Sequence, residues 1–170
     1  VPTGSYPDNS PSNNKGLSNL YSKTATPAYA HSYLLTEVLS ADYVDLTNDG
    51  PTDDDLGYWV KFNYIKQDNL FKWRAPYETN KGNNIEGKIT NDMDDMSGHS
   101  YGEKEMVYLE SIETKTHTAK FTLSQREDGL GVNNPNGGVN TSDKLLKLDV
   151  ITLYNKSAPS QPIKSVHFKY

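Results

Sequence analysis

The sequence predicts an all-β fold built of antiparallel hairpins, with long polar loops between the strands. Apolar residues alternate with polar residues at period two over several short segments. Clusters of Asn, Gly, Asp and Pro, which are the residues of tight turns, separate these segments. Helical periodicity is nearly absent, and the one ambiguous window, 33–39, contains Thr and Val, which favour a strand.

The first 29 residues predict an extended or flexible polar arm. Ser, Pro, Asn, Gly and Thr dominate residues 1–29, and apolar residues there follow no regular spacing. Such a segment buries too little apolar surface to offset the conformational entropy that ordering costs. We therefore expect one β-hairpin domain over residues 30–170, with the arm outside it.

Two strands and two hairpins are expected after residue 57. Segments 58–64 and 71–75 both alternate at period two, and residues 67–69 form a turn between them. A hairpin is expected within 104–124, and another joins 145–154 to 163–170 across residues 155–159. The long polar loops are expected at 45–57, 78–102 and 125–142.

Composition argues against several classes of protein. The chain has 17 basic and 22 acidic residues and a formal charge of −5, whereas a nucleic-acid partner selects a basic face. No run in the sequence approaches the ~20 apolar residues of a membrane-spanning helix, so no membrane span is expected. The absence of cysteine excludes disulfides, thiolate metal sites and thiol catalysis.

The chain is short of core material for its 170 residues. Hydrophobic residues make up 34%, and counting the 12 glycines in place of the 12 tyrosines leaves that fraction unchanged. An ordinary domain has ~45–50% by that convention. The chain starts at Val1 without an initiator Met and ends at Tyr170 within a predicted strand. We therefore expect a segment of a longer chain, a fragment or a processed product, whose core its neighbours complete.

Residues 45–53 have the order of oxygen ligands found in a calcium loop. Oxygen-bearing side chains occupy positions 1, 3, 5 and 9 of the loop, and Gly50 occupies position 6, where such loops turn sharply. The candidate ligands are the side chains of Asp45, Thr47, Asp49 and Asp53 and the backbone carbonyl of Pro51. Position 12 is Leu56 instead of Glu, so the pattern favours a short β-loop site, in which Asp54 or Asp55 substitutes. A solvated acidic turn is the alternative, because tight turns use the same residue types.

No spacing in the sequence predicts a catalytic site, and we expect that the protein is not an enzyme. The four histidines are isolated, and neither a nucleophile elbow nor a phosphate-binding glycine loop occurs. Carbohydrate binding is the alternative function, because aromatic side chains often line ligand sites. The residues that would carry it are Trp59, Trp73 and Tyr77. Aromatic residues at period two are also core residues, which is the competing interpretation.

Five segments of the sequence, 30–36, 38–50, 101–117, 148–154 and 162–170, resemble large secreted bacterial proteins of the Rhs/YD-repeat type. The resemblance covers about residues 27–170. It implies β-hairpins that wind into a spiral strip around a hollow shell, which holds a C-terminal toxin or effector or acts as an adhesive device on the cell surface. The repeat itself, G-x-x-x-x-x-Y-x-Y-D-x-x-G-R, does not occur here, so this segment would lie outside the repeat array.

Together these observations predict a non-catalytic structural or interaction segment of a secreted protein at the outer cell surface. The expected partner is the remainder of its own chain or a surface protein assembly, and a glycan is the alternative. Bound Ca²⁺ would hold a strand connection together where cysteine is absent, which is a stabilising role.

Overall fold

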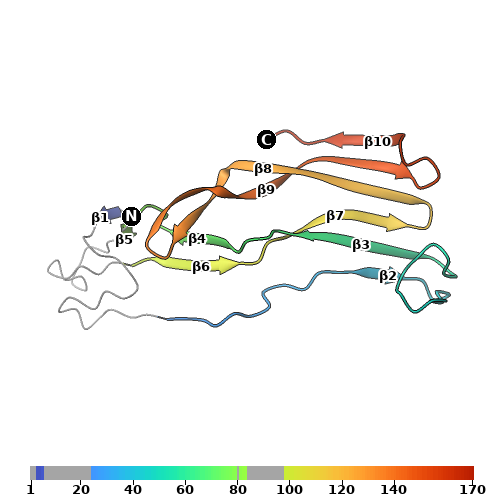
Figure 1. Ribbon diagram of the computed structural model, residues 1–170, viewed down its shortest axis with the longest axis horizontal. Coiled ribbons are helices and arrows are strands. Elements are labelled where there is room, and N and C mark those ends of the chain that lie inside the picture. Colours follow the sequence, from blue (N-terminus) through green and yellow to red (C-terminus); the bar gives the residue numbers. More distant parts are fainter. Residues whose placement is uncertain (1–2, 6–23, 80, 84–97) are drawn as a thin grey trace. The chain divides into compact units, whose positions relative to one another are not determined.

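A computed structural model describes residues 3–5, 24–79, 81–83 and 98–170 (Figure 1). These residues contain ten β-strands and no helix, which confirms the predicted all-β class. A helix able to cross a membrane is accordingly absent from this part of the chain. Residues 6–23 of the predicted arm, and residue 80 and residues 84–97 of the predicted loop 78–102, lie outside the described residues.

Six strands form one antiparallel sheet that does not close, in the order β10-β9-β8-β7-β3-β2 (Figure 1). They are β2 (Glu37–Leu39), β3 (Trp59–Lys66), β7 (Val107–Thr114), β8 (His117–Asn134), β9 (Gly137–Asn155) and β10 (Pro162–His167). Two smaller antiparallel sheets pair β4 (Phe71–Ala75) with β6 (Ser100–Lys104), and β1 (Thr3–Ser5) with β5 (Lys81–Asn83).

The chain divides into two compact units, each assembled from separate segments. The first unit contains Val1–Ala28, Asp68–Glu105 and Arg126–Leu145, and the second contains Tyr29–Gln67, Met106–Gln125 and Leu146–Tyr170. The long strands β8 and β9 contribute to both units. The first unit therefore holds both small sheets and the distal part of the β8–β9 hairpin, and the second holds the remaining part of the six-stranded sheet.

Two predicted hairpins of the second unit are confirmed. In β7 and β8, Ser111 lies opposite Lys120 and Glu113 lies opposite Thr118. In β9 and β10, Ile151 lies opposite Val166, although β10 ends at His167, before the predicted end of the strand at residue 170. The alternation of apolar and polar residues specifies which face of each strand is buried, and a short turn joins each strand to its partner. The sequence therefore specifies these two pairings.

The predicted polar loop at 125–142 is wrong, because these residues form the paired distal part of β8 and β9. Pro135 and Asn136 make the turn, where the Asn134 side-chain oxygen accepts a hydrogen bond from the Asn136 N–H at 2.9 Å. Gly137 follows with φ of +91°, and a Cβ there would lie 2.3 Å from the Glu78 carbonyl oxygen. Glycine is required at this point by both the backbone angle and the close approach.

The alternation predicts that Tyr58 shares a face with Val60, and Trp73 with Phe71, but burial in β3 and β4 does not follow these faces. Trp59 is 4% exposed, whereas its neighbour Tyr58 is 74% exposed. In β4, Trp73 is 43% exposed and Arg74 is buried. The Arg74 guanidinium donates to the carbonyl oxygens of Pro135 (2.9 Å), Pro76 and Glu78 (3.4 Å), and burial lowers its pKa.

The core is small, as the composition predicts. Among the described residues, the buried hydrophobic side chains are Phe71 and Val132 in the first unit and Trp59 in the second. Large apolar side chains on the outer strands of the six-stranded sheet are exposed instead, as at Val38 on β2 and Ile163 on β10. The described part of the second unit leaves much of its apolar surface in contact with solvent.

Candidate functional site

The predicted calcium loop lies within residues 40–58, which connect β2 to β3 in the second unit. The ends of this connection are held by Ser40, whose N–H donates to the Tyr58 carbonyl at 2.9 Å, and by an isolated bridge between Val44 and Leu56. Gly57 has φ of +77°, and a Cβ there would lie 2.5 Å from the Asp42 carbonyl oxygen. The connection is therefore closed at its base.

Asp55 is the centre of this loop, at 1% exposure. One carboxylate oxygen accepts the Leu46 N–H at 3.0 Å, and the other accepts the Thr52 N–H and the Tyr43 hydroxyl, both at 2.9 Å. Burial alone would raise the pKa of Asp55, but the hydrogen bonds from Leu46, Thr52 and Tyr43 outweigh it, so the pKa is lowered. Burial, together with the hydrogen bond to Asp55, raises the pKa of Tyr43.

The first three predicted ligands interact with the loop itself. The Asp45 carboxylate accepts the backbone N–H groups of Asn48 at 2.6 Å, Gly50 at 3.1 Å and Thr47 at 3.2 Å. The Thr47 hydroxyl donates to Asp49 at 2.7 Å. This is the hydrogen-bond pattern of an Asx turn, in which a side-chain carboxylate substitutes for backbone acceptors.

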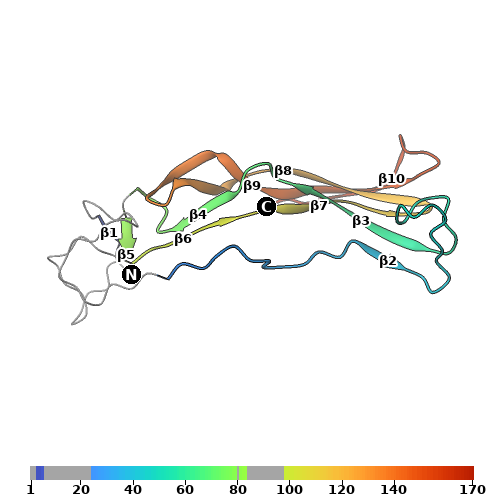
Figure 2. The same ribbon diagram turned by 60° about the horizontal axis from the view of Figure 1, so that its bottom comes forward.

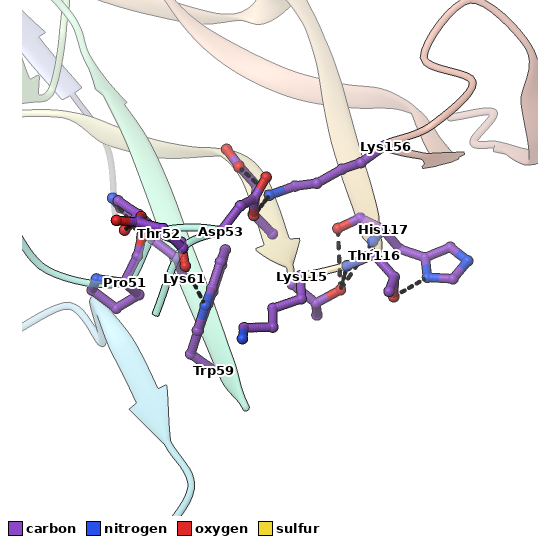
Figure 3. A network of polar contacts seen from close by, with 12 residues as sticks. Pro51, Thr52, Asp53, Trp59, Lys61, Lys115, Thr116, His117 and Lys156 are labelled. Atoms are coloured by element: carbon purple, nitrogen blue, oxygen red, sulfur yellow. Dashed lines mark hydrogen bonds and ion pairs between the residues drawn. The ribbon is translucent and has the colours of Figure 1, made fainter. Parts of the chain in front are cut away.

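Three lysines, Lys61, Lys115 and Lys156, bind the other half of the loop and are named here the lysine cluster. Figure 3 shows the contacts of Lys156. The Lys61 ammonium group donates to the Pro51 carbonyl at 3.3 Å. Lys115, in the β7–β8 turn, donates to the Asp55 carbonyl. Lys156, after β9, forms an ion pair with Asp53 at 2.7 Å and lies 3.5 Å from Glu113.

The lysine cluster joins three connections at one end of the second unit's sheet. The β2–β3 connection, the β7–β8 turn and the β9–β10 connection lie at that same end in both views (Figures 1 and 2). The Lys156 N–H also donates to the Thr116 carbonyl at 2.9 Å, which links the last two connections directly. Lysine side chains thus fix the loop to two connections that a backbone hydrogen bond holds together.

Trp59 packs beneath this loop (Figure 3). Its indole N–H donates to the Thr52 carbonyl at 2.9 Å, and the Lys156 ammonium lies 4.9 Å from the centre of its ring. An ammonium group at that distance over an indole face makes a cation–π interaction. One face of Trp59 is therefore covered by a lysine and its polar edge is already bonded.

The five predicted calcium ligands lie in one loop, but each has a partner from the chain. Pro51 and Asp53 contact lysines, and Asp45, Thr47 and Asp49 bond within the turn. Within the described ranges, the side chains form no group of three or more carboxylates or imidazoles placed to hold a metal ion. Calcium would have to displace lysine ammonium groups from Pro51 and Asp53, so calcium binding stays a prediction.

The predicted carbohydrate residues are divided between the two units. Trp59 belongs to the second unit and is buried, whereas Trp73 and Tyr77 belong to the first and are 43% and 58% exposed. Trp73 lies opposite Gly102 in the β4–β6 pair, and a Cβ at Gly102 would lie 2.7 Å from the indole nitrogen. The glycine therefore gives the Trp73 ring room to lie flat across the neighbouring strand.

A second feature of the second unit is an open groove of about 840 Å³ across β3, β7 and β8. Asn63 lies within it and donates to Ser111 at 2.9 Å and to Glu113 at 2.7 Å. Its other polar side chains include Glu110, Lys120 and Thr122. These groups could bond the hydroxyl groups of a polar ligand, but the sequence pattern did not single them out, since they come from three strands.

The residues that sequence reasoning missed are the lysine cluster and the central role of Asp55. Lys115 and Lys156 lie 60 and 103 residues from their loop partners, so no local spacing indicates these contacts. The sequence does indicate a role for Asp55, because Asp54 or Asp55 can substitute for the calcium ligand that is missing at position 12. Three successive aspartates, 53–55, do not indicate which one of the three carboxylates is buried.

Comparison with protein-family models, with curated proteins and with solved structures gives no match for this chain.

Proposed function

We propose that this chain is a non-catalytic structural and interaction segment of a larger β-assembly, secreted and exposed at the cell surface as the Rhs/YD-repeat resemblance implies. The observation that carries the proposal is the open six-stranded sheet, whose outer strands β2 and β10 are exposed at every residue. Exposed edge strands present unpaired backbone groups that accept another strand. In the proposed assembly, the remainder of the same chain or a neighbouring surface protein covers them.

The small core supports the same proposal. Ile163 and Val166 on β10 are 55% and 45% exposed, and Val38 on β2 is 50% exposed. Natural sheets that end at solvent carry charges, prolines or bulges on their edges. Here Pro162, the adjacent register shift and Lys164 protect the first half of β10. The remainder of the edge is suited to contact with another strand.

The test is sedimentation velocity of the intact chain over a wide range of concentrations. We expect reversible association that increases with concentration and weakens in Val166→Lys, because an edge lysine opposes strand addition. Tyr58→Lys is the matched control, since Tyr58 is 74% exposed but lies outside the outer strands. A protein that stays monomeric at every concentration would overturn the proposal.

Carbohydrate binding is the second candidate, and the exposure of Trp73 and Tyr77 favours it. Both residues lie in the first unit, and Tyr77 is held where its carbonyl accepts the Gly138 N–H at 2.9 Å. An exposed indole on a fixed strand offers a flat apolar surface to a sugar ring. The candidate site is therefore reduced to these two residues, with Trp59 supporting the fold instead.

A further inference from the structure

The two outer strands of the six-stranded sheet run in opposite directions. All neighbouring strands of this sheet are antiparallel, so six strands place β2 and β10 antiparallel to each other. A second copy in the same orientation, displaced sideways, therefore brings its β2 antiparallel to β10 of the first. The sheet would continue across the contact with the same strand pattern.

The backbone groups of β2 that face outward follow from its bonds to β3. The Phe62 N–H donates to the Thr36 carbonyl at 2.8 Å, and the Ser40 N–H donates to the Tyr58 carbonyl at 2.9 Å. Residues 36, 38 and 40 therefore bond β3, because hydrogen-bonding residues alternate along an antiparallel strand. The backbone groups of Glu37 and Leu39 face the open side.

The outward groups of β10 follow in the same way. The Phe168 N–H donates to the Asp149 carbonyl at 2.9 Å, and Val166 lies two residues earlier, opposite Ile151. Residues 164, 166 and 168 therefore bond β9. The backbone groups of Ser165 and His167 face the open side, with the same two-residue spacing as Glu37 and Leu39 on β2.

We propose that β10 of one copy of this chain pairs with β2 of a second copy, with Val38 opposite Val166. This proposal rests on the proposed function and names the partner edge. In this register the outward groups of Glu37 meet those of His167, and the outward groups of Leu39 meet those of Ser165. Every outward N–H and C=O between residues 37 and 39 then has a partner.

Charge favours this pairing over a symmetric one. The charged residue of β2 is Glu37, whereas β10 carries Lys164 and is followed by Lys169. Two β10 strands side by side would join two strands of positive charge, and two β2 strands would join two strands of negative charge, both of which are unfavourable. In the proposed register, Glu37 lies opposite His167 and diagonal to Lys169 on the same face, whereas Lys164 lies opposite Ser40 on the other face.

The two valines also belong to the same face of the sheet. Val38 on β2 lies opposite Val60 on β3, and Phe62 lies on the same face of β3 as Val60. Phe62 lies opposite Ile112 on β7, and Ile112 lies opposite Ala119 on β8, so all five side chains share one face. The Lys120 ammonium lies 5.6 Å from the Tyr154 ring, which puts Tyr154 on the other face from Ala119. Ile151 is three residues from Tyr154, so Ile151 and its partner Val166 share the face of Val38.

The absence of cysteine makes a disulfide test free of background. Val38 and Val166 would form a non-hydrogen-bonded pair, whose Cα atoms are about 4.5 Å apart, within the span of a disulfide. Val38→Cys and Val166→Cys are made as separate proteins with distinguishable tags, mixed, and equilibrated in a glutathione redox buffer. Both positions are half exposed, so the variants should fold, which circular dichroism checks.

We expect a disulfide dimer that contains one copy of each variant, at several-fold higher yield than the dimers of either variant alone. Lys164→Cys mixed with Val38→Cys is the register control and should give less product. Equal or greater product with Lys164→Cys, or a predominance of Val166→Cys dimers, would overturn the proposed contact. Association by sedimentation without the mixed disulfide would also overturn it but leave the proposed function standing, whereas a strict monomer would count against both.

Discussion

The Lys156 ammonium lies 2.7 Å from the Asp53 carboxylate, across 103 residues of sequence, and 4.9 Å from the centre of the Trp59 ring. This one side chain connects the end of β9 to the β2–β3 connection and covers the buried tryptophan. The Lys156 ammonium group therefore contacts Asp53, which the sequence predicts as a calcium ligand. The contacts favour a loop held by lysines over a loop held by calcium.

Replacing Lys156 should destabilise the protein measurably. Lys156→Met removes the ion pair with Asp53 and the cation–π contact with Trp59, and we expect a loss of roughly 1 kcal/mol in the free energy of unfolding. Urea denaturation measures the difference. Lys169→Met is the control, because Lys169 is exposed and lies beyond β10. Equal midpoints for the two variants would contradict the role given to Lys156.

Asp55 should contribute stability that depends on pH. Its pKa is lowered in the folded protein, so its contribution is present above the unfolded value near 3.8 and is lost as pH falls through the folded pKa. Asp55→Asn should lower the melting midpoint at pH 7, and its difference from the wild type should shrink below about pH 4. Thermal melts across that range measure this, with the exposed neighbour Asp54→Asn as control.

A pH-independent difference between wild type and Asp55→Asn would contradict this account. It would mean that the shape of the side chain, and not its charge, satisfies the N–H groups of Leu46 and Thr52.

Calcium binding has a direct test in the melting midpoint. If the Asp45–Asp53 loop binds Ca²⁺, calcium at a hundredfold excess over Kd should increase the free energy of unfolding by about 2.7 kcal/mol. The melting midpoint should then be higher in calcium than in a chelator. Asp49→Ala should remove the increase. An unchanged midpoint in calcium, with Asp49→Ala equally without effect, would exclude the site and leave the lysine cluster as the stabilising feature.

The two tryptophans should respond differently to substitution. Trp59 is buried and bonded to Thr52, so Trp59→Ala should cost about 3–5 kcal/mol of stability. Trp73→Ala should cost less, because Trp73 is 43% exposed. If the first unit binds glycans, fluorescence quenching on glycan titration should disappear in Trp73→Ala.

Tyr77→Ala tests the other residue of the candidate site and should weaken the quenching on glycan titration. Quenching that persists in Trp73→Ala would assign the signal to Trp59 and contradict the reduced site.

The local pairings were predictable, because alternation and a short connection specify them together. Residues 106–123 and 145–167 alternate around nearby turns, and both form the expected hairpins. Residues 125–142 were not predictable as strands from alternation alone. Gly129 and Gly131 occupy positions where an apolar residue would give the signal, and a Cβ at Gly131 would lie 3.0 Å from the Lys72 carbonyl oxygen. The Asn-Pro-Asn-Gly turn was the signal that could have revealed this hairpin.

The sequence by itself determined the all-β class, the small core and the position of the acidic loop, because each depends on composition or on short-range order. Tertiary structure alone decided which face of β3 buries Trp59, that Asp55 is the buried carboxylate, and that Lys115 and Lys156 reach Asp55 and Asp53 from distant connections. The physical reason is sequence distance. A lysine 60 or 103 residues away is adjacent to this loop only after β7, β8 and β9 have aligned their ends.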